Sequence, residues 1–174
     1  MKNKGLDYPY KRIGAMFSVA IMFIILGTSI SCSGDGEDLA ISLEGPVLSV
    51  SDFTGNWTAT SAIFESIDVP GNRLDIIEEG GSATLTVQAN GRFAITINTP
   101  GLGLETFSGE LGFNGEEYGD RLIVVFDGDA RDDYELFNIG FENNVLFLSG
   151  ITTFDFTGNG TEESAVIDLG MVRS

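Results

Sequence analysis

The sequence contains no histidine and a single cysteine, Cys32, so several common chemistries are excluded from it. Without a second cysteine, no disulfide forms within the chain. Metal sites built from histidine and cysteine are excluded, as are catalytic arrangements of the Ser-His-Asp and Cys-His kinds. No other catalytic motif is present, so we expect a protein that is not an enzyme and that has no cofactor and no metal site.

Positive charge is also scarce, and lysine does not occur after residue 11. From Cys32 to the C-terminus, five arginines face 25 acidic residues, which gives a formal charge of −20. A surface this acidic repels nucleic acid, which requires a basic footprint. The charge indicates an exported domain that its acids keep soluble, and a specific acidic binding face is the alternative.

Residues 1–31 have the parts of a bacterial export signal. A basic region ends at Lys11-Arg12, a long uncharged and mainly apolar stretch follows, and the small residue Ser31 precedes Cys32. We therefore expect residues 1–31 to be a cleaved signal peptide. The alternative is an uncleaved transmembrane anchor, because the apolar stretch approaches the length that spans a bilayer.

The segment Thr28-Ser29-Ile30-Ser31-Cys32 resembles the lipobox of bacterial lipoproteins. In that family the signal is cut before the cysteine, whose thiol then carries a diacylglycerol. The family prefers leucine three residues before the cysteine, where this chain has Ser29. The resemblance implies a lipid on Cys32 that anchors the protein to a membrane of the cell envelope, as in outer membrane lipoproteins.

Residues 32–51 are expected to form a flexible, acidic tether. The acidic run at 33–38 also resembles the signal that sends some Gram-negative lipoproteins to the outer cell surface. The two interpretations are compatible, and a position facing the periplasm is the alternative to surface display.

Beyond residue 51, short β-type runs alternate with glycine, asparagine and aspartate, which predicts an all-β meander. The expected strands are 55–65, 82–89, 92–98, 104–113, 121–127, 134–142, 144–151 and 163–173. Eight antiparallel strands in this order can close into an up-and-down barrel, which removes the exposed sheet edges. We expect residues 52–174 to form this barrel as a monomer.

The hairpin within 82–98 has a register that its apolar side chains determine. The dipeptide Asn90-Gly91 suggests a two-residue turn. A three-residue loop over 89–91 instead pairs Val87 with Phe93 and brings all the apolar side chains to one face. We expect the longer loop, because a slip by one residue would turn the buried set out to solvent.

Residues 66–81 form the one long link. Within it, residues 72–80 are expected to form one or two helical turns, with Asn72 as the N-cap, Asp75 returning the capping bond and Gly80 ending the turn. The segment is interpreted either as a lid over the barrel mouth or as an ordinary surface loop.

Three residues carry a resemblance to a known barrel family. Gly55-Asn56-Trp57 leads into the first strand, and Arg173 ends the last one. Gly-x-Trp at this place resembles the lipocalin signature, in which the tryptophan lies across the closed end of the barrel and a terminal arginine packs on it. The resemblance covers residues 50–174 and implies a lipocalin-like barrel with Gly55, Trp57 and Arg173 at its closed end. The alternative for Trp57 is a core aromatic in another β-fold.

Phenylalanines dominate the faces that are expected to point inward. The inward set is Phe93, Phe107, Phe113, Phe126, Phe137, Phe141 and Phe147, with the small residues Ala59, Ser61, Gly109, Ser149 and Ala165. If the barrel is hollow, the candidate ligand-lining residues are Phe93, Phe107, Phe126, Phe137 and Phe147. An eight-stranded barrel is barely wide enough for its own side chains, so a filled interior is equally consistent with this pattern.

Two function classes follow from these alternatives. A hollow barrel would bind a small apolar or amphipathic ligand, and a filled barrel would serve as a surface interaction or structural module. A third, weaker alternative is a glycosidase that uses a pair of the abundant carboxylates. The aspartate-rich segments 127–133 and 155–160 resemble calcium loops in composition, but they are expected to be turns.

Overall fold

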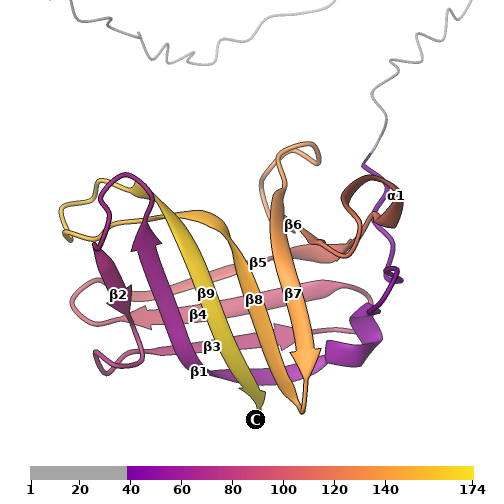
Figure 1. The fold of residues 1–174 in the computed structure, drawn as a ribbon, viewed down its shortest axis with the longest axis horizontal. Coiled ribbons are helices and arrows are strands. Elements are labelled where there is room, and N and C mark those ends of the chain that lie inside the picture. Colours follow the sequence, from indigo (N-terminus) through magenta and orange to yellow (C-terminus); the bar gives the residue numbers. More distant parts are fainter. Residues whose placement is uncertain (1–38) are drawn as a thin grey trace, which may run out of the picture. The chain divides into compact units, whose positions relative to one another are not determined.

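The computed structural model describes residues 39–174 as an all-β domain (Figure 1). The predicted signal peptide, Cys32 and the first part of the predicted tether lie outside the described residues. The strands are β1 (Gly55–Ser66), β2 (Arg73–Asp75), β3 (Ser82–Val87), β4 (Arg92–Thr99), β5 (Gly103–Phe113), β6 (Leu122–Phe126), β7 (Glu135–Glu142), β8 (Val145–Phe154) and β9 (Glu163–Arg173). A 3-10 turn (Val50–Phe53) precedes β1, and the four-residue helix α1 (Gly115–Tyr118) lies between β5 and β6. No helix in this part of the chain has the length and apolar character needed to cross a bilayer.

The sheet closes into the predicted eight-stranded, antiparallel, up-and-down barrel. Strands β3 to β8 each pair with the next strand along the chain, and β3 also pairs with β1. The ring closes because β9 pairs with β1 from Trp57↔Arg173 to Ser66↔Ala165. The eight strands of the ring begin and end within three residues of their predicted bounds. The fold class expected from the sequence is therefore confirmed.

The hairpin between β3 and β4 has the three-residue loop that its apolar pattern predicts. Val87 pairs with Phe93 and Leu85 with Ile95, so the apolar side chains share the inner face. Gly91 closes the loop with φ +82°, a conformation that glycine adopts without strain.

The long link between β1 and β3 forms the predicted tight turn at residues 76–80, which Gly80 ends with φ +86°, but it differs from its prediction before that turn. Residues 73–75 are extended and pair with residues 63–65 of β1, so Asn72 is not a helix N-cap. The Asp75 carboxylate accepts a hydrogen bond from the backbone N–H of Ile77 at 3.0 Å, and Ile76 is fully buried. Burial of this isoleucine ties the link to the barrel wall. No residue of 66–81 lines the cavity inside the barrel, so the link forms part of the barrel wall and not a lid.

The end of the predicted tether belongs to the folded domain. Ser42 and Phe113 exchange two backbone hydrogen bonds of 2.8 Å, and Val50 is fully buried in the barrel core. The Asp52 carboxylate accepts a hydrogen bond from the Ser49 N–H at 2.7 Å and so caps the 3-10 turn. The folded domain therefore begins before residue 52, because Ser42 pairs with β5 and the side chain of Val50 is buried in the core.

A β-bulge in β1 changes which side chains face inward. Ala59 pairs with Met171, but the next pair is Ser61 with Gly170, so Thr60 is an extra residue. After the bulge, Ala62 and Phe64 are buried. Ser61, which was expected to point inward, lies on the outer face because the extra residue reverses the alternation.

Candidate ligand cavity

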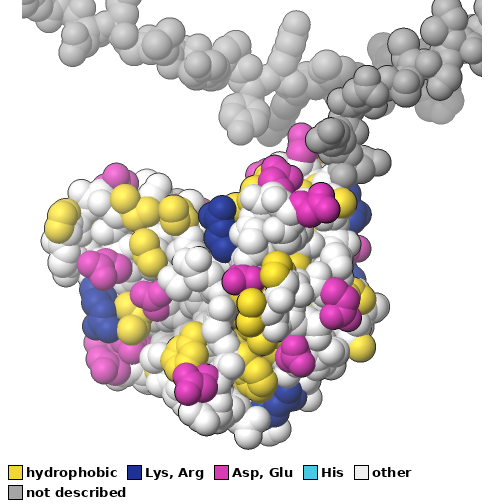
Figure 2. All heavy atoms as spheres, turned by 45° about the vertical axis from the view of Figure 1, so that its right-hand side comes forward, with side chains coloured by type: hydrophobic (Ala, Val, Ile, Leu, Met, Phe, Trp, Pro, Cys, Tyr) yellow, Lys and Arg dark blue, Asp and Glu magenta, His cyan; other side chains and the backbone are white. Residues whose placement is uncertain are grey.

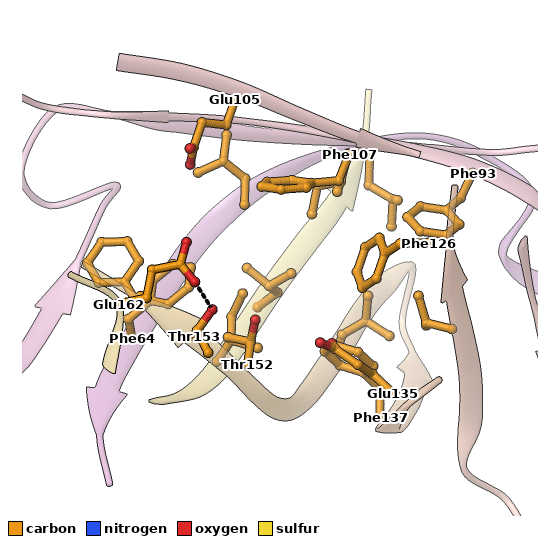
Figure 3. Close-up of a pocket in the computed structure, with 18 of the residues that line it drawn as sticks. Phe64, Phe93, Glu105, Phe107, Phe126, Glu135, Phe137, Thr152, Thr153 and Glu162 are labelled. Atoms are coloured by element: carbon orange, nitrogen blue, oxygen red, sulfur yellow. Dashed lines mark hydrogen bonds between the residues drawn. The ribbon is translucent and has the colours of Figure 1, made fainter. Parts of the chain in front are cut away.

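The barrel encloses a cavity of about 640 Å³ (Figure 3). All eight strands of the ring contribute side chains to it, and most of these side chains are apolar. The aliphatic part of the lining consists of Leu85, Ile95, Ile97, Leu102, Leu111, Leu122, Val124, Leu148, Ile167 and Leu169. The interior is therefore hollow, although it carries many phenylalanines.

Two glycines help to explain why the phenylalanines do not fill the barrel. A Cβ at Gly150 would lie 2.5 Å from the Phe137 ring, and a Cβ at Gly109 would lie 2.9 Å from the Phe93 ring. Each ring thus packs closely against a glycine on a neighbouring strand, where a side chain would otherwise stand. Rings that lie against the wall leave space along the barrel centre.

Four of the five phenylalanines predicted to line a ligand site do line this cavity. Phe126 lies at the centre of an edge-to-face cluster, with its ring centroid 5.8 Å from that of Phe93 and 6.2 Å from that of Phe107. Phe137 completes the set, and Figure 3 shows its ring beside Glu135 across from Phe107. The part of the cavity wall that these four phenylalanines form is therefore aromatic.

Phe147 was also predicted to line the site, and that prediction is wrong. Phe147 is 52% exposed and lies on the outer face of β8. The two-residue turn Asn143-Asn144 pairs Phe141 with Leu146, so Leu146 shares the inner face with Phe141. Because alternation then sends the next residue outward, Phe147 and Ser149 both lie outside. In the sequence, the length of the Asn143-Asn144 turn was the signal for which residues of β8 point inward.

Carboxylates gather toward the mouth of the cavity, a feature that the sequence analysis did not identify. Six acidic residues line the cavity: Glu105, Asp127, Asp129, Glu135, Asp155 and Glu162. Figure 3 shows Glu105 beside Phe107 on one wall and Glu162 hydrogen-bonded to Thr153 on another. The available signal was strand phase, since Glu105 is two residues from Phe107, and Glu135 two from Phe137, so each pair shares one face of its strand. Acidic side chains are also scattered over the face of the domain that Figure 2 shows.

Two of these carboxylates are compensated by nearby groups. Asp127 accepts hydrogen bonds of 2.6 Å from Arg92 and from Ser108, and these bonds lower the pKa of Asp127. For Asp155, lost hydration opposes ionisation, but hydrogen bonds from the N–H groups of Gly160 and Thr157 outweigh it and lower the pKa of Asp155. Asp155 thus organises the turn between β8 and β9. Among residues 39–174, no cluster of acids is arranged to hold a metal ion.

Glu135 is the carboxylate of the lining that has a buried oxygen without a partner. It is half-buried, and its Oε2 atom is buried without a hydrogen-bond partner. Burial raises the pKa of Glu135, and the charges of Asp129 and Asp133 raise it further. A buried carboxylate oxygen without a partner is costly to the fold, so this position favours any group that brings positive charge to it.

The closed end of the barrel contains the three residues of the expected signature. The Arg173 guanidinium lies 4.5 Å from the centroid of the Trp57 ring, and it donates hydrogen bonds to the backbone oxygens of Thr54 at 2.6 Å and Asp52 at 3.0 Å. Trp57 is fully buried and donates its indole N–H to the carbonyl oxygen of Phe53. This arrangement ties the last strand to the segment that enters the first.

Gly55 is required at this end by conformation and by space. Its φ is +136°, which residues with a side chain rarely adopt, and a Cβ would lie 2.7 Å from Arg173 Nη1. A glycine two residues before the tryptophan therefore lets the arginine reach across the indole.

Comparisons with known proteins give no relative for this chain. No protein-family model matches the sequence. A search of curated proteins likewise finds no match.

Proposed function

We propose that this chain is an exported, lipid-anchored protein of the cell envelope whose barrel binds a small apolar or amphipathic ligand. The observation that carries the proposal is the apolar cavity of about 640 Å³ inside the barrel. Ligand sites in proteins are concave, mostly apolar and about 300–1,000 Å³ in volume. The cavity falls within that range, and most of the side chains that line it are apolar.

The alternative function, an interaction module with a filled barrel, gains no support from the interior. A filled barrel would bury its inward phenylalanines against one another across the centre. Here Phe107 is 43% exposed although it points toward the cavity. An apolar wall left accessible in this way favours an occupant.

The membrane anchor in this proposal rests on the lipobox-like segment that ends at Cys32. A Cys32→Ser variant should fold normally and be released from the membrane fraction, because the lipidated thiol would be the only attachment. Fractionation of cells that express the wild type and the variant checks this. If the variant stays in the membrane fraction, the apolar N-terminal stretch itself is the anchor.

The ligand is tested by mass spectrometry of small molecules that co-purify with the full chain from membranes. Leu148→Trp should fill the cavity, since Leu148 lines it. Phe147→Trp is the matched control, because it makes a similar change one residue away on the outer face.

A bound ligand should be present on the wild type and on Phe147→Trp, and it should be strongly depleted on Leu148→Trp. Lipids that merely surround the anchor would be recovered equally from all three proteins. Equal recovery of every molecule, with circular dichroism showing folded protein, would contradict ligand binding in the barrel.

A further inference from the structure

The cavity has a one-sided charge that restricts what it can hold. Six carboxylates line it, and its lining contains no arginine or lysine. Among the salt bridges of residues 39–174, only Arg92–Asp127 involves a carboxylate of the lining, and its length is 2.6 Å. An anionic ligand would therefore meet negative charge with no partner in the lining.

The carboxylates of the lining are not equal. Asp127 is held by Arg92 and Ser108, Asp155 by the backbone of its own turn, and Glu162 accepts a 2.5 Å hydrogen bond from Thr153. Glu135 is the acid whose buried oxygen has no hydrogen-bond partner. A positive group beside Glu135 would therefore stabilise its ionised form.

The aromatic wall also favours positive charge. Phe93, Phe126 and Phe107 form an edge-to-face cluster on the cavity wall. Aromatic rings attract cations through the negative potential of their faces. Phe137, which is next but one to Glu135 on β7, extends this wall to the carboxylate.

We propose that the cavity selects amphipathic cations, in which an apolar body fills the apolar interior and an organic ammonium group pairs with Glu135. This inference rests on the proposed binding function and adds the charge of the ligand to it. A fatty acid or another amphipathic anion is the kind of ligand that the site rejects. The raised pKa of Glu135 agrees with this assignment, because a carboxylate that lacks a cation is harder to ionise.

The test compares three ligands with the same apolar body: octylammonium, octanol and octanoate. Near neutral pH the first is a cation, the second is neutral and the third is an anion. Each is titrated calorimetrically into the full chain in nanodiscs, with empty nanodiscs as the reference for partitioning into lipid. Octylammonium should bind about tenfold more tightly than octanol, and octanoate about tenfold more weakly.

The role of Glu135 is tested with a matched pair of variants. Glu135→Gln should reduce the preference for octylammonium over octanol by about threefold or more. Glu142→Gln is the control, because Glu142 lies on the same strand but at an exposed, outward position. It should keep the wild-type preference.

The possible failures have different meanings. If none of the three ligands binds, the proposed binding function fails. If octanol and octanoate bind as well as octylammonium, binding stands and the charge selectivity is overturned. If both glutamine variants lose the preference equally, general acidity and not Glu135 is responsible. The wild-type comparison alone decides the selectivity, so the proposal stays falsifiable even if Glu135→Gln does not fold.

Discussion

The side chain of Arg173 joins the end of the last strand to the segment that leads into the first strand. It stacks on Trp57 and donates hydrogen bonds to the backbone oxygens of Thr54 and Asp52. The stack needs Gly55, because any Cβ there would collide with the guanidinium. The spacing of glycine, tryptophan and terminal arginine is therefore a geometric requirement of this closed end.

Replacing Arg173 with alanine should lower the free energy of unfolding by about 1–3 kcal/mol, because the stack and two hydrogen bonds are lost together. Urea denaturation followed by Trp57 fluorescence measures the change. The native emission should also shift, since the cation leaves the indole face. Arg73→Ala removes an exposed arginine elsewhere and serves as the control. Equal stability of the two variants would contradict a structural role for the stack.

Glu135 makes the stability of the barrel depend on pH in a predictable direction. Its pKa is raised in the folded state by burial and by Asp129 and Asp133, so folding favours the protonated form. The stability that this group contributes is therefore present below the ordinary pKa range of glutamate and is lost as pH rises through the raised value. Ionisation of Glu135 at neutral pH therefore lowers the stability of the folded state.

Glu135→Gln should consequently be more stable than the wild type near pH 7, and the difference should shrink toward pH 4 as the wild-type group takes up its proton. Melting temperatures of both proteins across this range give the result. Glu142→Gln controls for the simple loss of one acidic charge from the same strand. A difference between Glu135→Gln and wild type that is constant with pH would show that ionisation of Glu135 is not its cause.

At the scale of single elements, strand phase decides which side chains reach the cavity. The run 145–148 is apolar at every position, so alternation alone does not say which residues point inward. The turn Asn143-Asn144 decides it, because both residues have positive φ, 53° and 62°, and form a two-residue hairpin loop. In β1 the phase changes at the bulge at Thr60, which leaves no clear mark in the sequence.

Asn144 can be used to test this turn. Asn144→Val should destabilise the domain by about 1–2 kcal/mol, because a β-branched residue tolerates the left-handed region poorly. Asn144→Gly should be at least as stable as the wild type. Asn98→Val, at an exposed position in β4, is the control for replacing asparagine with valine. Urea denaturation midpoints of the three variants measure these changes. If Asn144→Val and Asn98→Val had the same midpoint, the turn assignment would be refuted.

At the scale of the whole molecule, negative charge is the dominant electrostatic feature. Residues 39–174 hold five arginines and 22 acidic residues, a formal charge of −17. Only two salt bridges occur among the described residues, Arg92–Asp127 and Arg131–Glu110, and both are at the surface. Exposed pairs contribute little, so repulsion among the remaining acids outweighs them.

Salt should therefore stabilise the barrel. The melting temperature should rise by several degrees between about 10 mM and 300 mM sodium chloride, because screening reduces the repulsion over distances of a few ångströms to tens of ångströms. Sucrose at equal osmolality controls for effects that do not depend on charge. A melting temperature that falls with salt would mean that the ion pairs matter more than the repulsion.

The sequence by itself determined the features that repeat or that depend on residue type. Alternating apolar residues and their turns specified eight strands, and the register of the β3–β4 hairpin followed from Val87 and Phe93. The absence of histidine and the scarcity of cations limited the chemistry. Gly55, Trp57 and Arg173 marked the closed end because each has a geometric role that other residue types fill poorly.

The tertiary structure decided what depends on contacts between distant strands. The interior is hollow because Phe93 and Phe137 pack against glycines of neighbouring strands, and a linear pattern does not show such pairs. The acidic lining arises because the inward positions of different strands meet at one end of the cavity. Residues 39–51 join the fold for the same reason, since Ser42 pairs with the distant Phe113. In each case the free energy depends on neighbours that only the closed barrel brings together.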